Sequence, residues 1–336
     1  MSGSSRTVEA AGREVEVTSP DKVYFPGCSA TKGDLVDYYL KMADPLMNAA
    51  GHRPALLQRF PEGALGKSWF QKRVPAGAPS WLETLEVSTP NGTTSNALVL
   101  ADVAHVVWAV NLGCLGFHLW PSRVGLGAKA DELRIDLDPQ PGLGYAEVRE
   151  AAELVRALCA EVGIAAYPKT SGNRGIHVYA RLLPEWDSVQ VRAAAVALAR
   201  ELERRHPALI TAQWWKEERG RRIFVDFNQN APHKTVFGAW SVRPRAEGQV
   251  STPLSWPELM TEDPDSLTLQ TVPEHVVRKG DAWASMLLEP QRLDGLLELA
   301  RRDEAAGLPD APWPPQYPKM PGEPSRVAPS RARKQP

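Results

Sequence analysis

The chain has 336 residues, of which 43% are hydrophobic and 24% charged, and its formal net charge is −1. This length and composition predict a globular protein with a substantial core, built as one large domain or two fused lobes. A net charge so near zero excludes binding to a polyanion through bulk charge alone, although it leaves room for a local basic groove.

Targeting and redox signals are weak in this chain. No window approaches the roughly eighteen consecutive apolar residues of a membrane-spanning helix, and the N-terminus lacks the apolar core of a signal peptide. Cys28, Cys114 and Cys159 lie far apart without a CxxC pair, which argues against a disulfide framework and a structural zinc site. We therefore expect a cytoplasmic protein without membrane contact.

The predicted elements alternate between helices and strands. Apolar residues at helical spacing predict an amphipathic helix over residues 32–50. Residues 80–102 contain two β-rich runs around Asn91-Gly92, a hairpin signal. The elements that follow are a helix over 144–163, a strand over 175–182, a helix over 188–206 and a strand over 221–227. From Pro312 onward the chain is rich in proline with a basic end, and we expect an extended, poorly ordered tail.

The stretch "LRIDLDPQPG" places two aspartates on one predicted strand. Alternation puts Leu133, Ile135 and Leu137 on a core face and Arg134, Asp136 and Asp138 on the other. Neighbouring carboxylates repel, and such a pair usually persists because a cation lies between them. Hard divalent cations such as Mg²⁺ and Mn²⁺ take carboxylate oxygens. The alternative is that Asp-Pro simply opens a turn, and the motif alone leaves both interpretations open.

A third carboxylate is available in "RRIFVDFNQN". Two-metal phosphoryl transfer commonly needs one from elsewhere in the fold. Alternation here predicts a core face of Ile223, Val225 and Phe227, and an outer face of Arg222, Phe224, Asp226 and Asn228.

Two further segments carry groups suited to a polyphosphate. The small-residue turn from Ser171 to Gly175 includes Arg174 and precedes a strand with His177, so that backbone amides and a guanidinium could hold a triphosphate. After the third carboxylate come the potential counter-charges and donors Gln229, His233, Lys234, Arg243 and Arg245. The alternatives are an ordinary turn with a hydrogen-bonded core histidine, and a solvated basic loop.

Three of these segments together resemble a known family. "RIDLDP", "TSGNRGIHVY" and "VDFNQN" are similar to the motifs of primase-polymerases of the archaeal and eukaryotic primase superfamily, specifically the polymerase domain of bacterial ligase D and its stand-alone relatives. The likeness continues, in order, through "SPDKVYFPG", "TKGDLVDYY", "SWFQKRVPAGAPSWLET", "GCLGFHLWPSR", "VSTPLSWPEL" and "PKMPGEP". It covers the chain from about Val15 to Pro324.

The resemblance implies an α+β fold. Its core would be two mixed β-sheets flanked by helices, arranged as an RRM-like catalytic lobe plus an N-terminal lobe. We expect this catalytic domain over residues 15–311, after a flexible N-terminus over 1–14 and before the tail over 312–336.

The resemblance also implies site residues. Asp136, Asp138 and Asp226 would bind two Mn²⁺ or Mg²⁺ ions and carry catalysis. The implied nucleotide-binding residues are His118, Ser171, Arg174, His177, Gln229, Lys234 and Arg243. The implied DNA-binding residues are Lys22 and Lys32, which would hold a downstream 5′-phosphate, the template-stacking pair Trp69 and Phe70, and Lys72. The alternatives are a core aromatic pair and plain surface lysines.

Three positions depart from the family pattern. Gly116 lies where relatives often carry Glu, Leu119 replaces a usual Pro, and Trp69 replaces a common Phe. These departures affect the expected sugar and template contacts and leave the metal site unchanged.

The implied activity is a DNA-dependent nucleotidyltransferase that extends primers and fills short gaps or broken ends with NTPs or dNTPs in DNA repair, including non-homologous end joining. The absence of a convincing Ser-His-Asp or Cys-His arrangement agrees with chemistry that needs no covalent nucleophile. Implied partners are gapped DNA with a 5′-phosphate, a separate ATP-dependent DNA ligase and Ku, for a monomer at the nucleoid. The alternatives are a stand-alone primase, a non-catalytic DNA-end-binding module, and a nuclease with the same three carboxylates.

Overall fold

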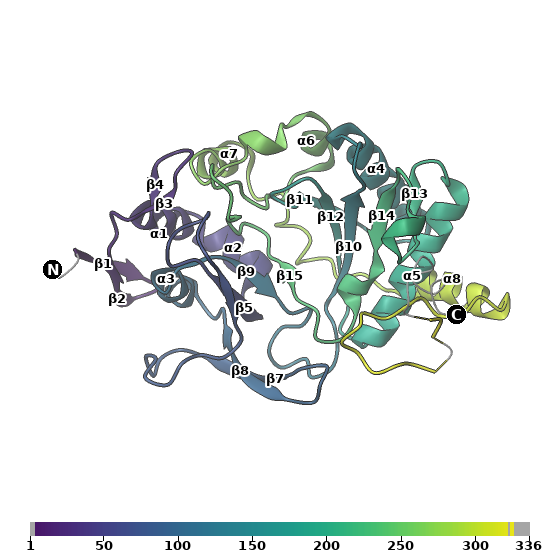
Figure 1. Ribbon diagram of the computed structural model, residues 1–336, viewed down its shortest axis with the longest axis horizontal. Helices are drawn as coiled ribbons and strands as arrows, with labels where there is room; N and C mark the ends of the chain where they lie inside the picture. The colour runs from purple at the N-terminus through teal and green to yellow at the C-terminus, as the bar shows by residue number, and fades with distance from the viewer. Residues whose placement is uncertain (1–3, 322, 326–336) are drawn as a thin grey trace, which may run out of the picture.

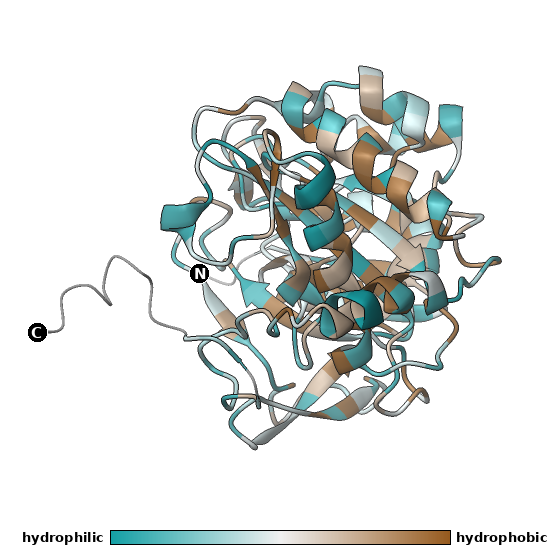
Figure 2. Ribbon diagram, turned by 90° about the vertical axis from the view of Figure 1, so that its right-hand side faces the viewer, coloured by the Kyte–Doolittle hydropathy of each residue, from teal (hydrophilic) through white to brown (hydrophobic). Residues whose placement is uncertain are grey.

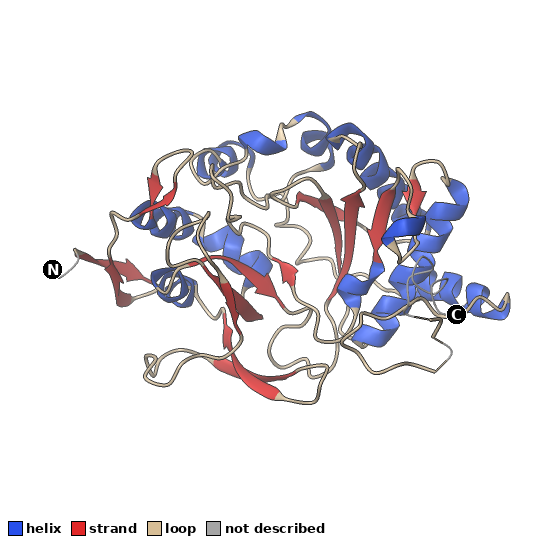
Figure 3. Ribbon diagram, in the orientation of Figure 1, coloured by secondary structure: helices blue, strands red, loops and turns tan. Residues whose placement is uncertain are grey.

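The computed structural model describes residues 4–321 and 323–325. Two large β-sheets, each flanked by helices, form an α+β fold (Figures 1 and 3). In Figure 2 the helices carry both brown and teal residues along their length, as helices with one apolar side do. None of the helices in the described part of the chain is long and apolar enough to cross a membrane.

The first sheet has five strands in the order β11-β12-β10-β14-β13. Strand β10 lies between β12 and β14 and is antiparallel to both, whereas β13 pairs with β14 in parallel. Helices α4 and α5 pack against this sheet and cover the apolar face predicted for β10, where Leu133, Ile135 and Leu137 are buried. The bounds are β10 Glu132–Pro139, β11 Tyr167–Thr170, β12 Ile176–Arg181, β13 Ile210–Thr211, β14 Ile223–Asp226, α4 Tyr145–Glu161 and α5 Ser188–Arg205.

The second sheet is antiparallel in the order β15-β9-β5-β8-β7, with β6 also paired to β5. The hairpin predicted around Asn91-Gly92 is confirmed, because β7 and β8 are adjacent and Gly92 takes a φ of 78° in the turn. The bounds are β5 Pro54–Arg59, β6 Trp69–Gln71, β7 Thr84–Ser88, β8 Thr94–Val99, β9 Cys114–Leu119 and β15 Val236–Phe237.

Further elements surround the two sheets. They include the strands β3 Val23–Phe25 and β4 Ala30–Thr31, the helices α3 Val103–Asn111, α6 Trp256–Thr261, α7 Val272–Lys279 and α8 Asp294–Ala305, and the 3₁₀ turns η1 Lys216–Glu218, η2 Phe227–Asn230 and η3 Pro264–Ser266.

The single helix predicted over residues 32–50 is two helices, α1 (Lys32–Lys41) and α2 (Ala43–Ala50). Thr31 and Asp34 form a capping box that starts α1. Pro45 has no N–H, and its ring would clash with the carbonyl four residues earlier; it is therefore tolerated in the first turn of α2 but prevents α1 from continuing into it. The apolar periodicity continued across this break and concealed it.

The flexible N-terminus expected over residues 1–14 is wrong for the described part from Ser5 onward. Strands β1 (Ser5–Ala10) and β2 (Arg13–Thr18) form an antiparallel hairpin. Its turn uses positive φ angles at Ala11 (48°) and Gly12 (72°). One face of the hairpin is apolar and packs against α3, which explains its order.

The tail expected to be poorly ordered from Pro312 onward is docked in its first part. Trp313 is only 3% exposed, and it packs with Tyr317 and Ala231 in a small apolar cluster. The two aromatic side chains supply a buried surface that a composition averaged over many prolines conceals. Residues 326–336, which include the basic end, lie outside the described residues.

Candidate active site

Three carboxylates meet at the open face of the five-stranded sheet. Asp136 and Asp138 lie on the same face of β10, and Asp226 is the last residue of β14, directly opposite Asp136 in the antiparallel register. Oxygen atoms from all three lie within 4.8 Å of one another. An all-carboxylate donor set this close fits Mg²⁺ or Mn²⁺, which take oxygen ligands.

Burial raises the pKa of each carboxyl, and repulsion between the acids adds to this at Asp136 and Asp226. Burial and then the charges of Asp138 and Asp226 hold the pKa of Asp136 well above its usual range. Burial and then the charge of Asp138 raise the pKa of Asp226 to about 6. The pKa of Asp138 is also raised, chiefly by burial. The cluster therefore favours a bound proton or a bound cation.

The turn η2 orients the third carboxylate. The backbone N–H of Asn228 donates to Asp226 Oδ1 at 2.9 Å. Gln229 Nε2 donates to Asp226 Oδ2 at 2.9 Å and lies 3.3 Å from Asp136 Oδ2, so it bridges two of the acids. The outward face predicted for this segment is wrong at Phe224 and Asn228, which are buried, because β14 ends at Asp226 and its outer side is covered.

His177 lies opposite Asp136 on β12, with its Nε2 atom 3.3 Å from Asp136 Oδ1. Burial, together with the charges of Lys169 and Arg243, lowers its pKa well below the usual range, so the imidazole is neutral. Its Nδ1 atom is buried without a hydrogen-bond partner among the described residues.

The turn after β11 is held by hydrogen bonds to the Ser171 side chain. Ser171 Oγ accepts the backbone N–H groups of Asn173 and Gly175, both at 3.1 Å, and Arg243 Nε donates to the Ser171 carbonyl at 2.6 Å. Gly172 has a φ of 69°, and a Cβ atom there would lie 2.7 Å from Arg243 Cγ, so this turn requires glycine. Two of the acids and the turn line a common cavity of about 150 Å³, whose charged and polar lining includes Asp136, Asp138, Ser171, Arg174, His177 and Arg243.

A second cavity of about 340 Å³ holds other predicted residues. Its lining includes Phe70, Lys72, His118 and Lys234, and also Tyr317 from the docked tail. The His118 ring meets Phe70 and Phe237 edge-on, at 5.5 and 5.2 Å between centroids. Arg243 from the first cavity stacks on the same Phe237 at 3.6 Å.

His118 is a neutral, partly unsatisfied group in this cavity. Its Nε2 atom is buried without a hydrogen-bond partner among the described residues, and burial lowers its pKa to about 4. Trp69 does not line either cavity; it is 48% exposed, and the Arg59 guanidinium lies 5.1 Å from its ring.

Lys22 and Lys32 lie together, apart from both cavities. Lys22 Nζ pairs with the exposed Glu62 at 2.8 Å. Lys32 is 4% exposed, and its Nζ atom donates to the Thr18 carbonyl at 2.6 Å and to Asn111 Oδ1 at 2.7 Å. Burial and then the charge of Lys22 lower the pKa of Lys32 to about 8. The alternative of a plain surface lysine is therefore wrong for Lys32.

Two cations near the acids were missed from sequence. Lys169 is fully buried on β11 and donates to the Phe237 carbonyl at 3.1 Å and to Ser251 Oγ at 2.5 Å. Arg219 lies over the Phe224 ring at 3.5 Å, and its charge acts on Asp138 and Asp226. Neither residue gave a clear local signal, because Lys169 stands in the short strand Tyr-Pro-Lys-Thr and Arg219 in a charged loop.

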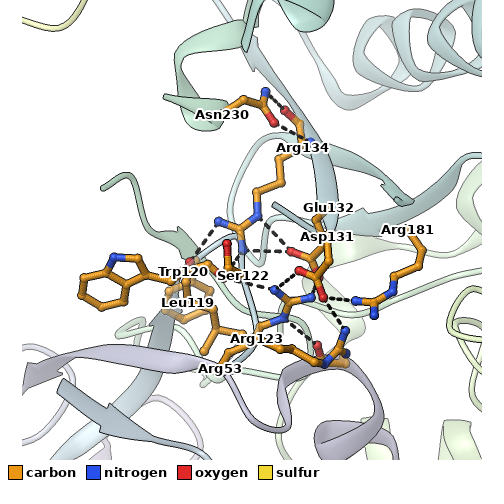
Figure 4. A network of polar contacts seen from close by, with 12 residues as sticks. Arg53, Leu119, Trp120, Ser122, Arg123, Asp131, Glu132, Arg134, Arg181 and Asn230 are labelled. Atoms are coloured by element: carbon orange, nitrogen blue, oxygen red, sulfur yellow. Dashed lines mark hydrogen bonds and ion pairs between the residues drawn. The ribbon is translucent and has the colours of Figure 1, made fainter. Parts of the chain in front are cut away.

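A buried ion network, also missed, ties β10 to the second sheet (Figure 4). Arg53, which precedes β5, pairs with Asp131 and Glu132 at 2.7 Å each, at the start of β10. Arg134 donates to the Leu119 and Trp120 carbonyls at 2.9 and 2.7 Å. The network holds β10 and its aspartates against the end of β9.

Both the sequence and the structure match known proteins. The family model described as "LigD, primase-polymerase domain" matches residues 31–283. The multifunctional non-homologous end joining proteins LigD of Mycolicibacterium smegmatis and Mycobacterium tuberculosis are 30% and 31% identical, over 91% and 90% of this chain. The chain spans only about two fifths of these relatives, 40% and 41% of their length.

A solved structure, the polymerase domain of Mycobacterium tuberculosis ligase D in complex with DNA, superposes with a TM-score of 0.76 at 31% identity, covering 82% of this chain and 99% of that one. The bifunctional LigD of Bacillus subtilis is 29% identical over 83% of this chain and 45% of its own. The chain belongs to the family of LigD primase-polymerase domains.

Proposed function

We propose that this protein is a DNA-dependent nucleotidyltransferase that extends primers and fills short gaps or broken ends with NTPs or dNTPs during DNA repair. The observation that carries the proposal is a cluster of three carboxylates, two of which line the same cavity as Arg174, His177 and Arg243. Carboxylates alone would suit many metal enzymes, but carboxylates facing guanidinium groups suit a metal-bound polyphosphate.

Asp136, Asp138 and Asp226 would hold two divalent cations, which supply charge stabilisation at the α-phosphate and the departing pyrophosphate. Arg174 and Arg243 would bind the triphosphate, and the neutral His177 would offer a hydrogen bond without adding charge beside Asp136. Gln229 would keep Asp226 aimed at Asp136. The work of the protein is then positioning and electrostatics, as expected for phosphoryl transfer.

The second cavity would receive the rest of the nucleotide and the template. His118 offers a buried, unpaired nitrogen, Phe70 is 53% exposed as a stacking surface, and Lys72 and Lys234 supply positive charge. Aromatic stacking with nearby cations binds single-stranded nucleic acid with little base preference.

The test is primer extension on a gapped duplex by Asp136→Ala and Asp138→Ala, with ribo- and deoxyribonucleotides and with Mn²⁺ and Mg²⁺. We expect loss of nucleotide addition with duplex binding retained, because metal ligands serve chemistry while basic residues serve affinity. Asp44→Ala, which removes an exposed carboxylate from α2, is the matched control. Extension by either active-site variant at the rate of this control would refute the role given to the carboxylates, whereas DNA binding without extension by the wild-type protein would leave a non-catalytic end-binding module.

We further propose that Lys22 and Lys32 bind the 5′-phosphate at the downstream side of a gap or break. The buried ammonium of Lys32 has only neutral oxygen partners among the described residues, so it carries a charge ready for an anion. The double variant Lys22→Ala, Lys32→Ala should lose the preference for phosphorylated gaps and keep extension on an open primer-template. Equal affinity of the wild-type protein for the two gaps would favour a stand-alone primase instead.

The LigD name of the relatives supports a role in end joining, with a separate ATP-dependent ligase and Ku as proposed partners. Purified Ku on a DNA end should raise the occupancy of this protein there. Exclusion of the protein by Ku would count against that partnership.

A further inference from the structure

The turn η2 is held from two opposite sides. Toward the metal site, Asp226 and Gln229 face Asp136, as described above. Away from it, the side chain of Asn228 points into a buried polar cluster, where its Oδ1 atom accepts from Arg192 Nε at 2.7 Å. Its Nδ2 atom donates to the Pro312 carbonyl at 3.0 Å. Asn228 therefore connects Asp226, the third carboxylate, to the C-terminal segment.

We call residues 310–321 the C-terminal strap, which runs in yellow at the lower right of Figure 1. Arg192, from α5, is only 1% exposed and binds the strap through its guanidinium. It donates to the Ala311 carbonyl at 2.8 Å and pairs with Asp310 at 3.0 Å. The Trp313 ring lies 3.9 Å from the guanidinium carbon, and its Nε1 atom donates to Asp310 at 2.7 Å.

The strap also contacts the residues that directly follow η2. Tyr317 donates its hydroxyl hydrogen to the Pro232 carbonyl, and its ring packs with Trp313 and Ala231. The turn is thus anchored at Asn228, near its start, and at Pro232, just after its end.

We propose that the strap positions η2 and thereby sets the divalent-cation affinity of the carboxylate cluster. Asp226 is the last residue of β14 and lies within 4.8 Å of two other carboxylates, which like charge pushes apart, so its position depends on the turn that follows. Groups that orient a metal ligand through a second residue commonly change affinity when they are removed. The inference rests on the proposed metal site and adds Trp313 and Arg192 to it as positioning residues.

The experiment measures Mn²⁺ binding directly, by the paramagnetic resonance of free Mn²⁺, so that activity is not the readout. Trp313→Ala should weaken Mn²⁺ binding about 3- to 10-fold, less than the roughly 10- to 100-fold typical of a direct outer-shell partner. At saturating Mn²⁺, kcat should recover towards the wild-type value. Measurements are made on folded protein, well below the melting temperature of each variant.

Trp256→Ala is the matched control. Trp256, on α6, is likewise stacked against an arginine, Arg156 at 5.0 Å, and donates its indole hydrogen to the Ala166 carbonyl at 2.8 Å. A purely structural role for Trp313 predicts that both variants lose stability and neither loses Mn²⁺ affinity. That result would overturn the proposal.

If Trp313→Ala does not fold, Tyr317→Phe decides the question, because it removes a single hydroxyl group from the strap. We then expect a weaker but measurable loss of Mn²⁺ affinity, and an unchanged affinity would refute the inference. Asp136→Ala distinguishes a failure of the proposed metal site from a failure of the strap proposal. If it binds Mn²⁺ as the wild type does, the metal site itself is wrong; if it does not, failure of the strap variants counts against the strap alone.

Discussion

Replacing Asn111 with aspartate tests the lysine pair without touching either lysine. Asn111, the last residue of α3, accepts from Lys32 Nζ at 2.7 Å and from the Thr18 backbone N–H at 2.9 Å. Its amide nitrogen donates to the Glu16 carbonyl at 2.9 Å. The substitution keeps the size of the side chain and its acceptor oxygen. It places a negative charge beside the buried Lys32 ammonium, which we propose binds a phosphate.

The expected loss of phosphate affinity follows from the distances between the charges. A phosphate oxygen bonded to Lys32 Nζ at about 2.8 Å would lie about 5 Å from the new carboxylate, where two unit charges repel by about 3 kcal/mol at an effective dielectric constant of 20. This energy corresponds to about 100-fold in the dissociation constant. Screening by salt reduces the effect, and we expect the variant to lose at least about tenfold of the preference for a phosphorylated gap.

The assay is a binding titration on matched gaps with and without the 5′-phosphate, at fixed ionic strength, since backbone contacts weaken steeply with salt. Gln190→Glu is the control, because it adds the same charge at an exposed position of α5 where a glutamate preserves the capping box with Asp187. Extension of an open primer-template should be unchanged in both variants. A phosphate preference that survives in Asn111→Asp would refute the reasoning about Lys32.

Three other predictions concern stability and metal binding. Because the pKa of Asp226 is raised to about 6 from a usual value near 4, the metal-free folded protein should lose stability as pH rises through that window. Mn²⁺ needs the deprotonated carboxylate, so the gain in Tm on adding Mn²⁺ should be larger at pH 7 than at pH 5, and an equal gain would contradict this. Arg53→Met removes the cation that pairs with both Asp131 and Glu132, which keep Arg123, Arg181 and Arg134 as partners, so the loss in urea unfolding should stay below the roughly 3–5 kcal/mol of an uncompensated buried charge; a loss no larger than that of Arg292→Met, in an exposed pair, would show that Arg53 contributes little. Gly116→Ala would bring a Cβ atom to 2.4 Å from Phe237 Cζ and should lower stability by about 1–3 kcal/mol, and an unchanged Tm would mean that the ring moves aside at no cost.

The Gly116 departure has a structural explanation. The resemblance implies Glu at this position, but here Phe237 and the Val242 carbonyl occupy the space that any side chain would need. The ring of Phe237 also supports both His118 and Arg243. Glycine at position 116 therefore accommodates an aromatic residue between the two cavities.

Local patterns were sufficient to predict much of the five-stranded sheet that carries the three carboxylates. Alternation along β10 correctly separated the core residues from Asp136 and Asp138, because side chains on a strand point to opposite faces whatever the tertiary context. Asn91-Gly92 correctly marked a hairpin, because its turn needs a positive φ. These signals depend on backbone geometry over a few residues, which the sequence specifies directly.

Tertiary structure decided which of these groups meet and what surrounds them. The register that sets Asp226 opposite Asp136, the buried cations Lys169 and Lys32, and the network around Arg53 join residues that are far apart in the chain. The strap was mispredicted for the same reason, since Trp313 is ordered by Arg192 on a distant helix and not by its proline-rich neighbours. Burial, pairing register and long-range contacts depend on how the whole chain packs, and no local window of sequence contains that information.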